Sequence, residues 1–324
     1  APQGFARLTL AGFKAFRVPL SVDLRPLTIV AGANSAGKST FVQGLLFLKQ
    51  TLEAPFDPGP LLLDGPIVRV DDARKLLWRA SASEGADVFT IGFDLSDGTG
   101  VSSTFGADPS GPLLVSTEYR YVGLEGSRTD SIRVTDGLTE GAARPRRNRC
   151  FIELPPPMGP SLNLSAWPAH PLHQLVHLPG LRGNPERAYK VASAPSDDRY
   201  PGSFVHYVAT MLVHWQEVGD PRLAEVSRAL RALHLTTHIR PARRSHTEVE
   251  LEVGRDAPHV QGGSNEQVNI ADVGFGVSQV LPVVVALVAA RPGQLVHIEQ
   301  PELHLHPRAQ VALASELIRA AKRG

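Results

Sequence analysis

The sequence predicts a mixed α/β fold, in which short strands alternate with helices that carry an apolar face. A run of β-like segments opens the chain, and a helix with a buried face follows over residues 41–52. The last third alternates helix, strand and helix over 277–290, 294–298 and 307–323. With 324 residues, of which 42% are apolar and 20% charged, the chain is long enough to bury a substantial core.

The N-terminal elements lead into a glycine-containing loop. Segments 7–13 and 16–24 alternate apolar and polar residues, which is typical of half-buried strands. LTIVA (27–31) is continuously apolar and predicts a fully buried strand. The helix over 41–52 is expected to end at the Pro/Gly cluster of residues 54–60.

The middle of the chain is predicted to be β-rich first and helical later. Between residues 61 and 160, short β-like runs are separated by Gly, Ser and Asp, with one helix expected near 71–79. Segments 203–215 and 221–233 have the apolar spacing of two amphipathic helices joined by a Gly-Asp turn. The segment 248–253 returns to strand periodicity.

Composition and charge exclude several classes of protein. The single cysteine, Cys150, excludes an internal disulfide framework and a multi-thiolate metal site. A net charge of +1 argues against a protein whose whole surface binds nucleic acid or membranes through positive charge. The N-terminus has no signal-like pattern, and the apolar stretch 280–290 is too short to span a membrane, so we expect a cytoplasmic protein without membrane contact.

The segment GANSAGKS (32–39) matches the phosphate-loop pattern G-x-x-x-x-G-K-[ST]. It lies between a predicted strand and a predicted helix, a context that distinguishes it from an ordinary glycine turn. Glycines let backbone N–H groups surround phosphates, the lysine supplies a positive charge, and the serine hydroxyl can ligate Mg²⁺. The predicted nucleotide-binding residues here are Gly32, Ala33, Asn34, Ser35, Ala36, Gly37, Lys38, Ser39 and Thr40.

A phosphate-loop ATPase also needs a carboxylate at the end of a neighbouring strand to hold magnesium. The apolar segment 294–298 leads to Glu299 at such an end, so Ser39 and Glu299 are the predicted metal ligands. The next residue would normally be a carboxylate that activates the attacking water, but here it is Gln300. A glutamine can position water but cannot take its proton, so we expect slow ATP hydrolysis unless Glu302 or another group substitutes.

A third motif lies about 25 residues upstream of Glu299, in ADVGFGVSQVLP (271–282). Its small-residue turn opens a buried helix, and such a turn presents N–H groups to an anion. Gly274, Gly276 and Ser278 are the predicted nucleotide contacts, although glycine turns at helix starts are common and this motif alone is weak.

The order of these motifs resembles ATP-binding-cassette ATPases of the SMC, RecF and OLD type. The stretch LTLAGFKAFRVPLSVDLRPLTIVAGANSAGKST resembles their first strands and phosphate loop, DVGFGVSQVLP their signature loop, and EQPELHLHP their Walker B segment and D-loop. HLPGLRGNPERAYKV (177–191) is similar to a middle segment of bacterial OLD-like ATPases. Relatives include ATPase subunits of anti-phage systems, such as the Septu type, which work with a nuclease partner.

The resemblance implies an α/β P-loop head of ABC/SMC-like architecture with a β-rich lobe and a helical insertion. It also implies ATP and Mg²⁺ as cofactors and a second head as partner, in a homodimer or higher oligomer in which each signature loop caps the ATP of the other head. The usual signature serine is replaced by Gly274, and the family's switch histidine would lie beyond Gly324. The expected parts are a first half of the head with the P-loop, a β-rich lobe, a helical insertion and a truncated second half of the head, over residues 1–60, 61–160, 161–245 and 246–324.

These residues are compatible with two functions. The first is an ATP-driven conformational switch in a bacterial anti-phage defence or DNA-processing complex. The second, favoured by Gln300, is a non-hydrolysing assembly module in which ATP holds partner subunits such as a nuclease together. A P-loop kinase or GTPase is a third reading, weakened by the lack of an N-K-x-D motif.

Some histidines and arginines are further candidate binding residues. His304 and His306 have no third ligand at conventional spacing, which argues against zinc there, and His297 is expected to be a satisfied core residue. Two arginine clusters, RPRRNR (144–149) and RPARR (240–244), are candidates for DNA contact, although most short basic runs are simply solvated.

Overall fold

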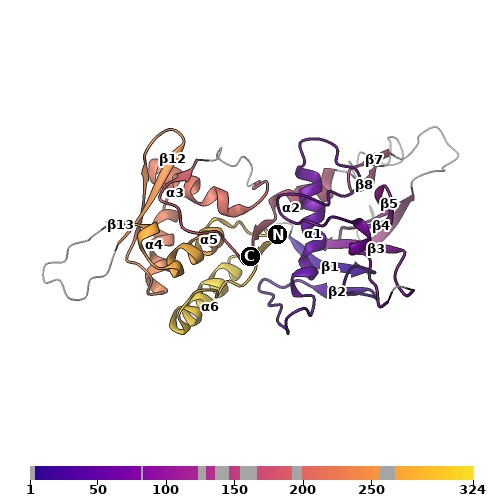
Figure 1. Ribbon diagram of the computed structural model, residues 1–324, viewed down its shortest axis with the longest axis horizontal. Helices are drawn as coiled ribbons and strands as arrows, with labels where there is room; N and C mark the ends of the chain where they lie inside the picture. Colours follow the sequence, from indigo (N-terminus) through magenta and orange to yellow (C-terminus); the bar gives the residue numbers. More distant parts are fainter. Residues whose placement is uncertain are drawn as a thin grey trace, which may run out of the picture. The chain divides into compact units, whose positions relative to one another are not determined.

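The chain forms two units, and each is described by itself (Figure 1). Unit 1 comprises Ala1–Leu175 and Gly293–Leu295, and unit 2 comprises Val176–Pro292 and Val296–Gly324. The structure is a computed structural model and describes residues 4–81, 83–122, 129–135, 146–153, 166–191, 199–254 and 267–324.

Unit 1 is built on a six-stranded antiparallel sheet with the strand order β2-β1-β3-β4-β5-β6. Strands β3 to β6 therefore continue the sheet that the first two strands begin. The strands are β1 (Phe5–Ala11), β2 (Leu20–Asp23), β3 (Val88–Leu95), β4 (Gly100–Asp108), β5 (Gly111–Val122) and β6 (Thr129–Thr135). The other elements are α1 (Lys38–Glu53), a 3-10 turn (Ala73–Leu76), the short hairpin β7 (Arg146–Asn148) and β8 (Phe151–Glu153), and α2 (Ala166–Gln174).

Helix α1 packs directly on this sheet, and Gly44 permits the close approach. A Cβ atom at Gly44 would lie 2.8 Å from Leu10 Cδ2 and 3.2 Å from Ile91 Cγ2, so only a glycine fits without a shift. Phe13 and Phe89 extend the core, with ring centroids 5.5 Å apart. The predicted helix over 41–52 is thus confirmed and begins three residues earlier, at the end of the phosphate loop.

Polar groups fix the C-terminal end of α1. Lys49, whose side chain is fully buried, forms an ion pair with Glu53 and donates to the carbonyl of His173 at 3.2 Å. Arg149 Nη1 donates to the carbonyl of Thr51 at 2.8 Å, one of the last carbonyls of the helix. Because a helix leaves its last carbonyls without intrahelical partners, this arginine acts as a C-cap.

The predicted buried strand over 27–31 is wrong. These residues are irregular, and Leu27, Ile29 and Val30 expose 39%, 79% and 46% of their surface. The Thr28 hydroxyl accepts from the Arg25 N–H at 2.9 Å, which turns the chain away from β2. A strand needs a hydrogen-bonded neighbour, and none of the described strand pairings includes this segment.

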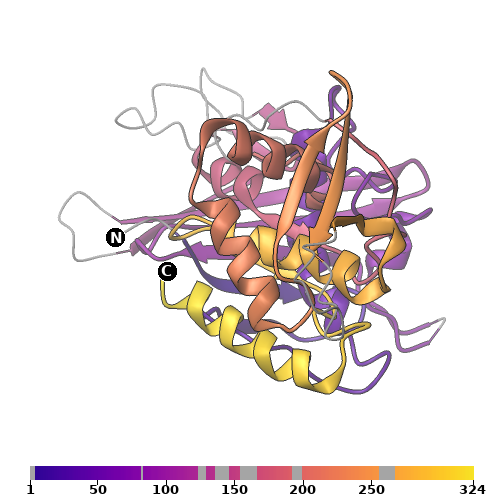
Figure 2. The ribbon, with the colours of Figure 1, turned by 90° about the vertical axis from the view of Figure 1, so that its left-hand side faces the viewer.

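Unit 2 surrounds helix α5 (Phe275–Ala289), nearly all of whose residues from Val277 onwards are buried. The unit also contains a parallel pair of strands, β9 (Val176–Leu178) and β14 (Val296–Ile298). Its antiparallel sheet has the strand order β10-β12-β11, and β13 also pairs with β12. The long β11–β12 hairpin is seen in orange in Figure 2. The remaining bounds are β10 (Tyr189–Lys190), β11 (Ile239–Arg243), β12 (Glu248–Gly254), β13 (Gln267–Asn269), 3-10 turns Phe204–Tyr207 and Ile270–Asp272, α3 (Val208–Val218), α4 (Arg222–Ala232) and α6 (Pro307–Ala321).

Most predicted elements of unit 2 are confirmed. The two amphipathic helices are α3 and α4, and Gly219 between them adopts a φ of 67°, the left-handed conformation that ends a helix. The helix expected near 71–79 in unit 1 is only the 3-10 turn that Asp72 caps. The described residues contain no helix that is long and apolar enough to cross a membrane.

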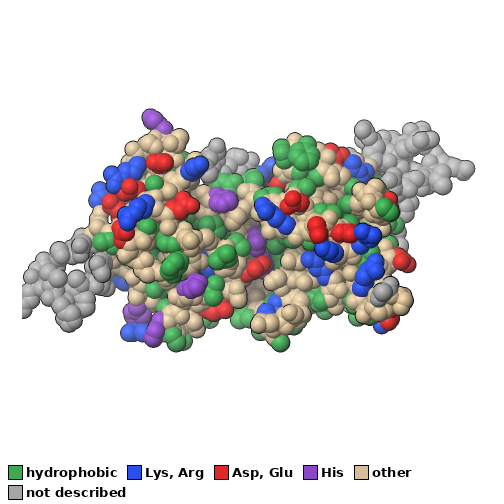
Figure 3. Space-filling view, in the orientation of Figure 1, with side chains coloured by type: hydrophobic (Ala, Val, Ile, Leu, Met, Phe, Trp, Pro, Cys, Tyr) green, Lys and Arg blue, Asp and Glu red, His purple; other side chains and the backbone are tan. Residues whose placement is uncertain are grey.

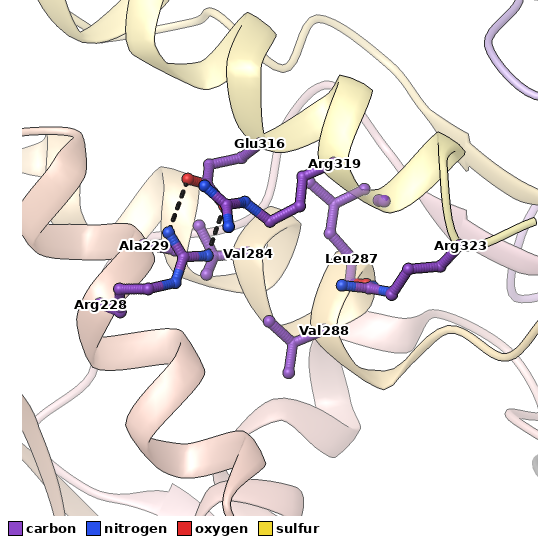
Figure 4. Close-up of a pocket in the computed structure, with 9 residues that line it drawn as sticks. Arg228, Ala229, Val284, Leu287, Val288, Glu316, Arg319 and Arg323 are labelled. Carbon is purple, nitrogen blue, oxygen red and sulfur yellow. Dashed lines mark hydrogen bonds and ion pairs between the residues drawn. The ribbon is translucent and has the colours of Figure 1, made fainter.

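Ion pairs join α4 to α6 across a small pocket lined with α5 residues (Figure 4). Arg228 makes a bidentate pair with Glu316 at 3.0 and 2.7 Å, and Arg319 lies 3.6 Å from the same carboxylate. Arg323 donates to the carbonyl of Leu287. These arginines have partners within the unit, so the pocket is part of the helix packing.

Candidate functional site

The predicted phosphate loop joins the irregular segment before it to α1 in unit 1. Gly37 is the N-cap of α1 and has a φ of 86°, which a residue with a side chain rarely adopts. A Cβ atom there would also lie 3.1 Å from the Cβ of Ala15. Ser35 has a φ of 64°, so the loop turns through two left-handed residues.

The electrostatics at this end of α1 favour an anion. No side chain in the described part of the chain caps the helix, and its first turn contains no acidic residue. The first N–H groups of any helix lack intrahelical acceptors and carry the positive end of the helix dipole. Residues 31–36 and Ser39 are exposed, so a ligand has access to these donors.

Lys38 is the first residue of α1, and its amino group folds back over the loop. Its Nζ donates to the carbonyls of Gly32 and Ala33 at 2.8 and 2.7 Å. These neutral carbonyls hold the ammonium group beside the exposed N–H donors. A phosphate group could replace them as a stronger, charged acceptor.

Glu299 follows β14 in unit 2, and its backbone N–H continues the pairing with β9 by donating to Leu178 O at 2.9 Å. Its carboxylate lies 3.5 Å from His177 Nε2. The interaction with His177 lowers the pKa of Glu299 below its ordinary value, although partial burial opposes this shift. The side chain is therefore an ionised carboxylate at neutral pH, as a magnesium ligand must be.

Arg182 holds the turn that contains Glu299 and Gln300. Its Nη2 donates to the carbonyls of Glu299 and Gln300 at 2.5 and 3.1 Å, and its Nη1 donates to Gln279 O in α5 at 3.3 Å. The residue is only 6% exposed. Arg182 therefore fixes the local backbone of unit 2 through these hydrogen bonds.

Gln300 itself is exposed and has a φ of 44°. Its amide lies against Gly180, where a Cβ atom would come within 2.8 Å of Gln300 Oε1. Glu302 is exposed and lies two residues further along the same turn. These residues and Glu299 belong to one short segment of unit 2, whereas the phosphate loop belongs to unit 1.

The signature-like turn opens α5, also in unit 2. Gly274 is the N-cap, no side chain caps this helix, and its first turn has no acidic residue. Gly274 is exposed, with no atom within 4 Å of a built Cβ, and Phe275 exposes 52% of its surface. Gly276 packs near the carbonyl of His304, and the Ser278 hydroxyl donates to Phe275 O within the helix. Of the three predicted contacts in this turn, Gly274 is thus the most open to a ligand.

The arginines of the two basic clusters whose side chains the structure describes have intramolecular partners. Arg147 pairs with Asp57 at 2.7 Å, Arg243 with Glu217 at 2.7 Å, and Arg244 with Glu250 at 2.5 Å. Basic and acidic side chains are interspersed on the face seen in Figure 3. Residues 144 and 145 of the first cluster lie outside the described residues. These contacts lend no support to a DNA-binding patch.

Sequence reasoning missed one feature beside Glu299. His297 was expected to be a satisfied core residue, but its buried Nδ1 has no hydrogen-bond partner in the described part of the chain, and its ring stacks on His177 at 5.3 Å between centroids. Burial and the neighbouring His177 lower the pKa of His297 to about 4. Their pairing across 120 residues follows from strand register, for which the sequence carries no local signal.

The chain was compared with solved structures, curated proteins and protein-family models. Among solved structures, the SMC head domain from Thermotoga maritima matches with 11% identity and a TM-score of 0.43, covering 98% of this chain and 86% of that one. No curated protein matches the chain significantly. The family model described as "AAA domain, putative AbiEii toxin, Type IV TA system" matches residues 27–324.

That match covers all three sequence motifs and most of the chain, whose α/β fold places a glycine-rich loop at the start of a helix. The chain is an ATP-binding P-loop ATPase domain and belongs to the AAA-domain family with that description.

Proposed function

We propose that the chain binds Mg·ATP at residues 32–40 and acts in the cytoplasm as an ATP-dependent conformational switch in a bacterial anti-phage defence or DNA-processing complex. The uncapped, acid-free N-terminus of α1, with Lys38 at its first position, carries the proposal. The family description, which mentions a toxin of a toxin–antitoxin system, is compatible with a defence role.

The residues suit the cofactor. Exposed N–H donors and Lys38 would bind the phosphates, and the Ser39 hydroxyl and the ionised Glu299 would hold Mg²⁺ directly or through water. Bound Mg²⁺ supplies charge neutralisation at the terminal phosphates. Gln300 orients water without accepting its proton, so hydrolysis is slow.

Lys38→Ala is expected to weaken ATP binding by about tenfold or more, because a charge-assisted hydrogen bond to phosphate contributes roughly 1.5–3 kcal/mol. Fluorescent-ATP titration would measure this loss. Single-turnover hydrolysis should fall in parallel. Lys75→Ala is the matched control, since Lys75 is an exposed lysine of unit 1 whose partner is Asp71. Equal ATP affinities of wild type and Lys38→Ala would mean that the phosphate loop does not bind ATP as proposed.

The rival function, a non-hydrolysing assembly module, is favoured by Gln300 and is separated by the same assay. In that case Lys38→Ala still weakens binding, but the hydrolysis rates of wild type and variant are indistinguishable. A protein partner such as a nuclease fits either function.

A second ATPase head is the expected partner, in a homodimer or higher oligomer. The exposed, uncapped turn at Gly274 is suited to cap the terminal phosphate held by another head. Gly274 has a φ of −61°, which any residue can adopt, so side chains can be introduced there without strain.

Gly274→Glu is expected to abolish ATP-dependent dimerisation, because a carboxylate would face the phosphates of the partner. Light scattering with Mg·ATP would show a monomer mass for this variant and a dimer mass for wild type. Gly274→Ser, which adds a side chain without charge, should still dimerise. The capping proposal fails if Gly274→Glu dimerises as wild type does, or if wild type shows no ATP-dependent change in mass.

A further inference from the structure

Two histidines and a carboxylate converge at the carboxyl end of the parallel strand pair in unit 2. The register of β9 and β14 places His177 directly opposite His297. Directly opposed side chains point to the same face, and a residue two positions along a strand shares that face. Glu299 is two positions beyond His297, so all three side chains emerge on one side.

Their ligand atoms are close enough to share an ion. One ligand atom of each of the three residues lies within 4.8 Å of the other two. The separation between His177 Nε2 and Glu299 Oε1 is 3.5 Å. Two ligands of a tetrahedral zinc ion at about 2.0–2.1 Å are about 3.3 Å apart, so this pair already has the required spacing.

Two buried nitrogens at this position lack partners among the described residues. His177 is 5% exposed, and neither its Nε2 nor the Nδ1 of His297 makes a hydrogen bond with a residue that the structure describes. At 3.5 Å, the contact of His177 Nε2 with Glu299 does not complete one. A buried polar atom without a partner costs free energy. A ligand that accepts these two nitrogens as donors would remove that cost.

The donor set selects the class of ion. Mg²⁺ is bound by oxygen ligands, whereas neutral imidazoles with a carboxylate suit zinc and neighbouring divalent transition metals. Two histidines and one carboxylate are the protein ligands of several open zinc sites, whose fourth position is taken by water or substrate. Glu299 is only partly buried, which leaves that side accessible.

We infer that His177, His297 and Glu299 bind a divalent transition-metal ion of the zinc type in unit 2, in the absence of nucleotide. The two rings are parallel within 9°, and ligation requires one of them to rotate about χ2 so that both nitrogens point at one position. This torsion is broad and soft for histidine.

The test uses the whole chain and Zn²⁺ alone as the probe, without ATP. Equilibrium dialysis with metal analysis should give one tightly bound Zn²⁺ per chain. His177→Leu and His297→Phe should each weaken binding by at least about 100-fold, since even partners that only orient a ligand change affinity by about 10- to 100-fold. His246→Ala, which removes an exposed histidine of the same unit, should bind as wild type does.

A second measurement needs no variant. X-ray absorption of the zinc-loaded wild type should show two imidazole ligands, and Co²⁺ should give the visible bands of a four-coordinate site. The inference is overturned if wild type binds no stoichiometric Zn²⁺, if both histidine variants bind with unchanged affinity, or if the spectrum lacks imidazole. Because Glu299 also serves the proposed function, ATP binding is followed separately through Lys38→Ala, and either proposal can fail alone.

Discussion

Gln300→Glu is expected to raise the single-turnover rate of ATP hydrolysis by about 100-fold, because a positioned general base contributes roughly 10²- to 10⁴-fold. The substitution is isosteric and places a proton acceptor where the wild type has only an amide. Gln300 is exposed, and its backbone conformation suits either residue equally, so the fold should not change. Rapid-quench measurement with excess enzyme would determine the rate.

Two variants make this result specific. Gln300→Ala should be no faster than wild type, since it removes the amide without adding a base. Glu302→Gln should lower the wild-type rate only if Glu302 is the substitute base. If Gln300→Glu hydrolyses ATP at the wild-type rate, then the attacking water is not activated at this position, and the explanation for slow hydrolysis is wrong.

Arg182→Leu is expected to destabilise unit 2 by about 3 kcal/mol. The change removes a donor from the carbonyls of Gln279, Glu299 and Gln300, of which Gln300 O keeps the Leu303 N–H at 3.2 Å. A buried acceptor left unsatisfied costs about 1–3 kcal/mol. These carbonyls lie in α5 and in the Glu299 turn, so the variant should also loosen that turn. Urea unfolding would show a lower midpoint, and hydrogen exchange would show reduced protection at residues 296–303.

Arg187→Leu is the matched control in the same loop. Arg187 pairs with Asp272 at 2.6 Å, but its side chain is 72% exposed. Exposed ion pairs contribute about 0–1 kcal/mol, so this variant should unfold close to wild type. Equal midpoints for the two variants would contradict the role assigned to Arg182.

The elements that the sequence predicted well are those with a strong internal pattern. Helices α1, α5 and α6 carry apolar residues at helical spacing, and the 248–253 alternation formed β12. The phosphate loop was recognised because its function fixes residue types at consecutive positions.

The elements that the sequence could not predict depend on distant partners. LTIVA (27–31) has strand composition but none of the described strands pairs with it. His177 and His297 come together only through parallel pairing, which local periodicity does not encode. Arg182 likewise donates to carbonyls that are 97 to 118 residues away in the sequence. Its hydrogen bonds therefore could not be predicted from the local sequence.

The central claim is that residues 32–40 bind Mg·ATP. Isothermal titration of the wild-type chain with ATP in the presence of Mg²⁺ tests it most directly, because it needs neither hydrolysis nor a partner. We predict saturable binding with one ATP per chain and a clear loss of affinity in Lys38→Ala but not in Lys75→Ala. An absence of saturable heat from the folded wild type, or equal affinities for all three proteins, would contradict the account.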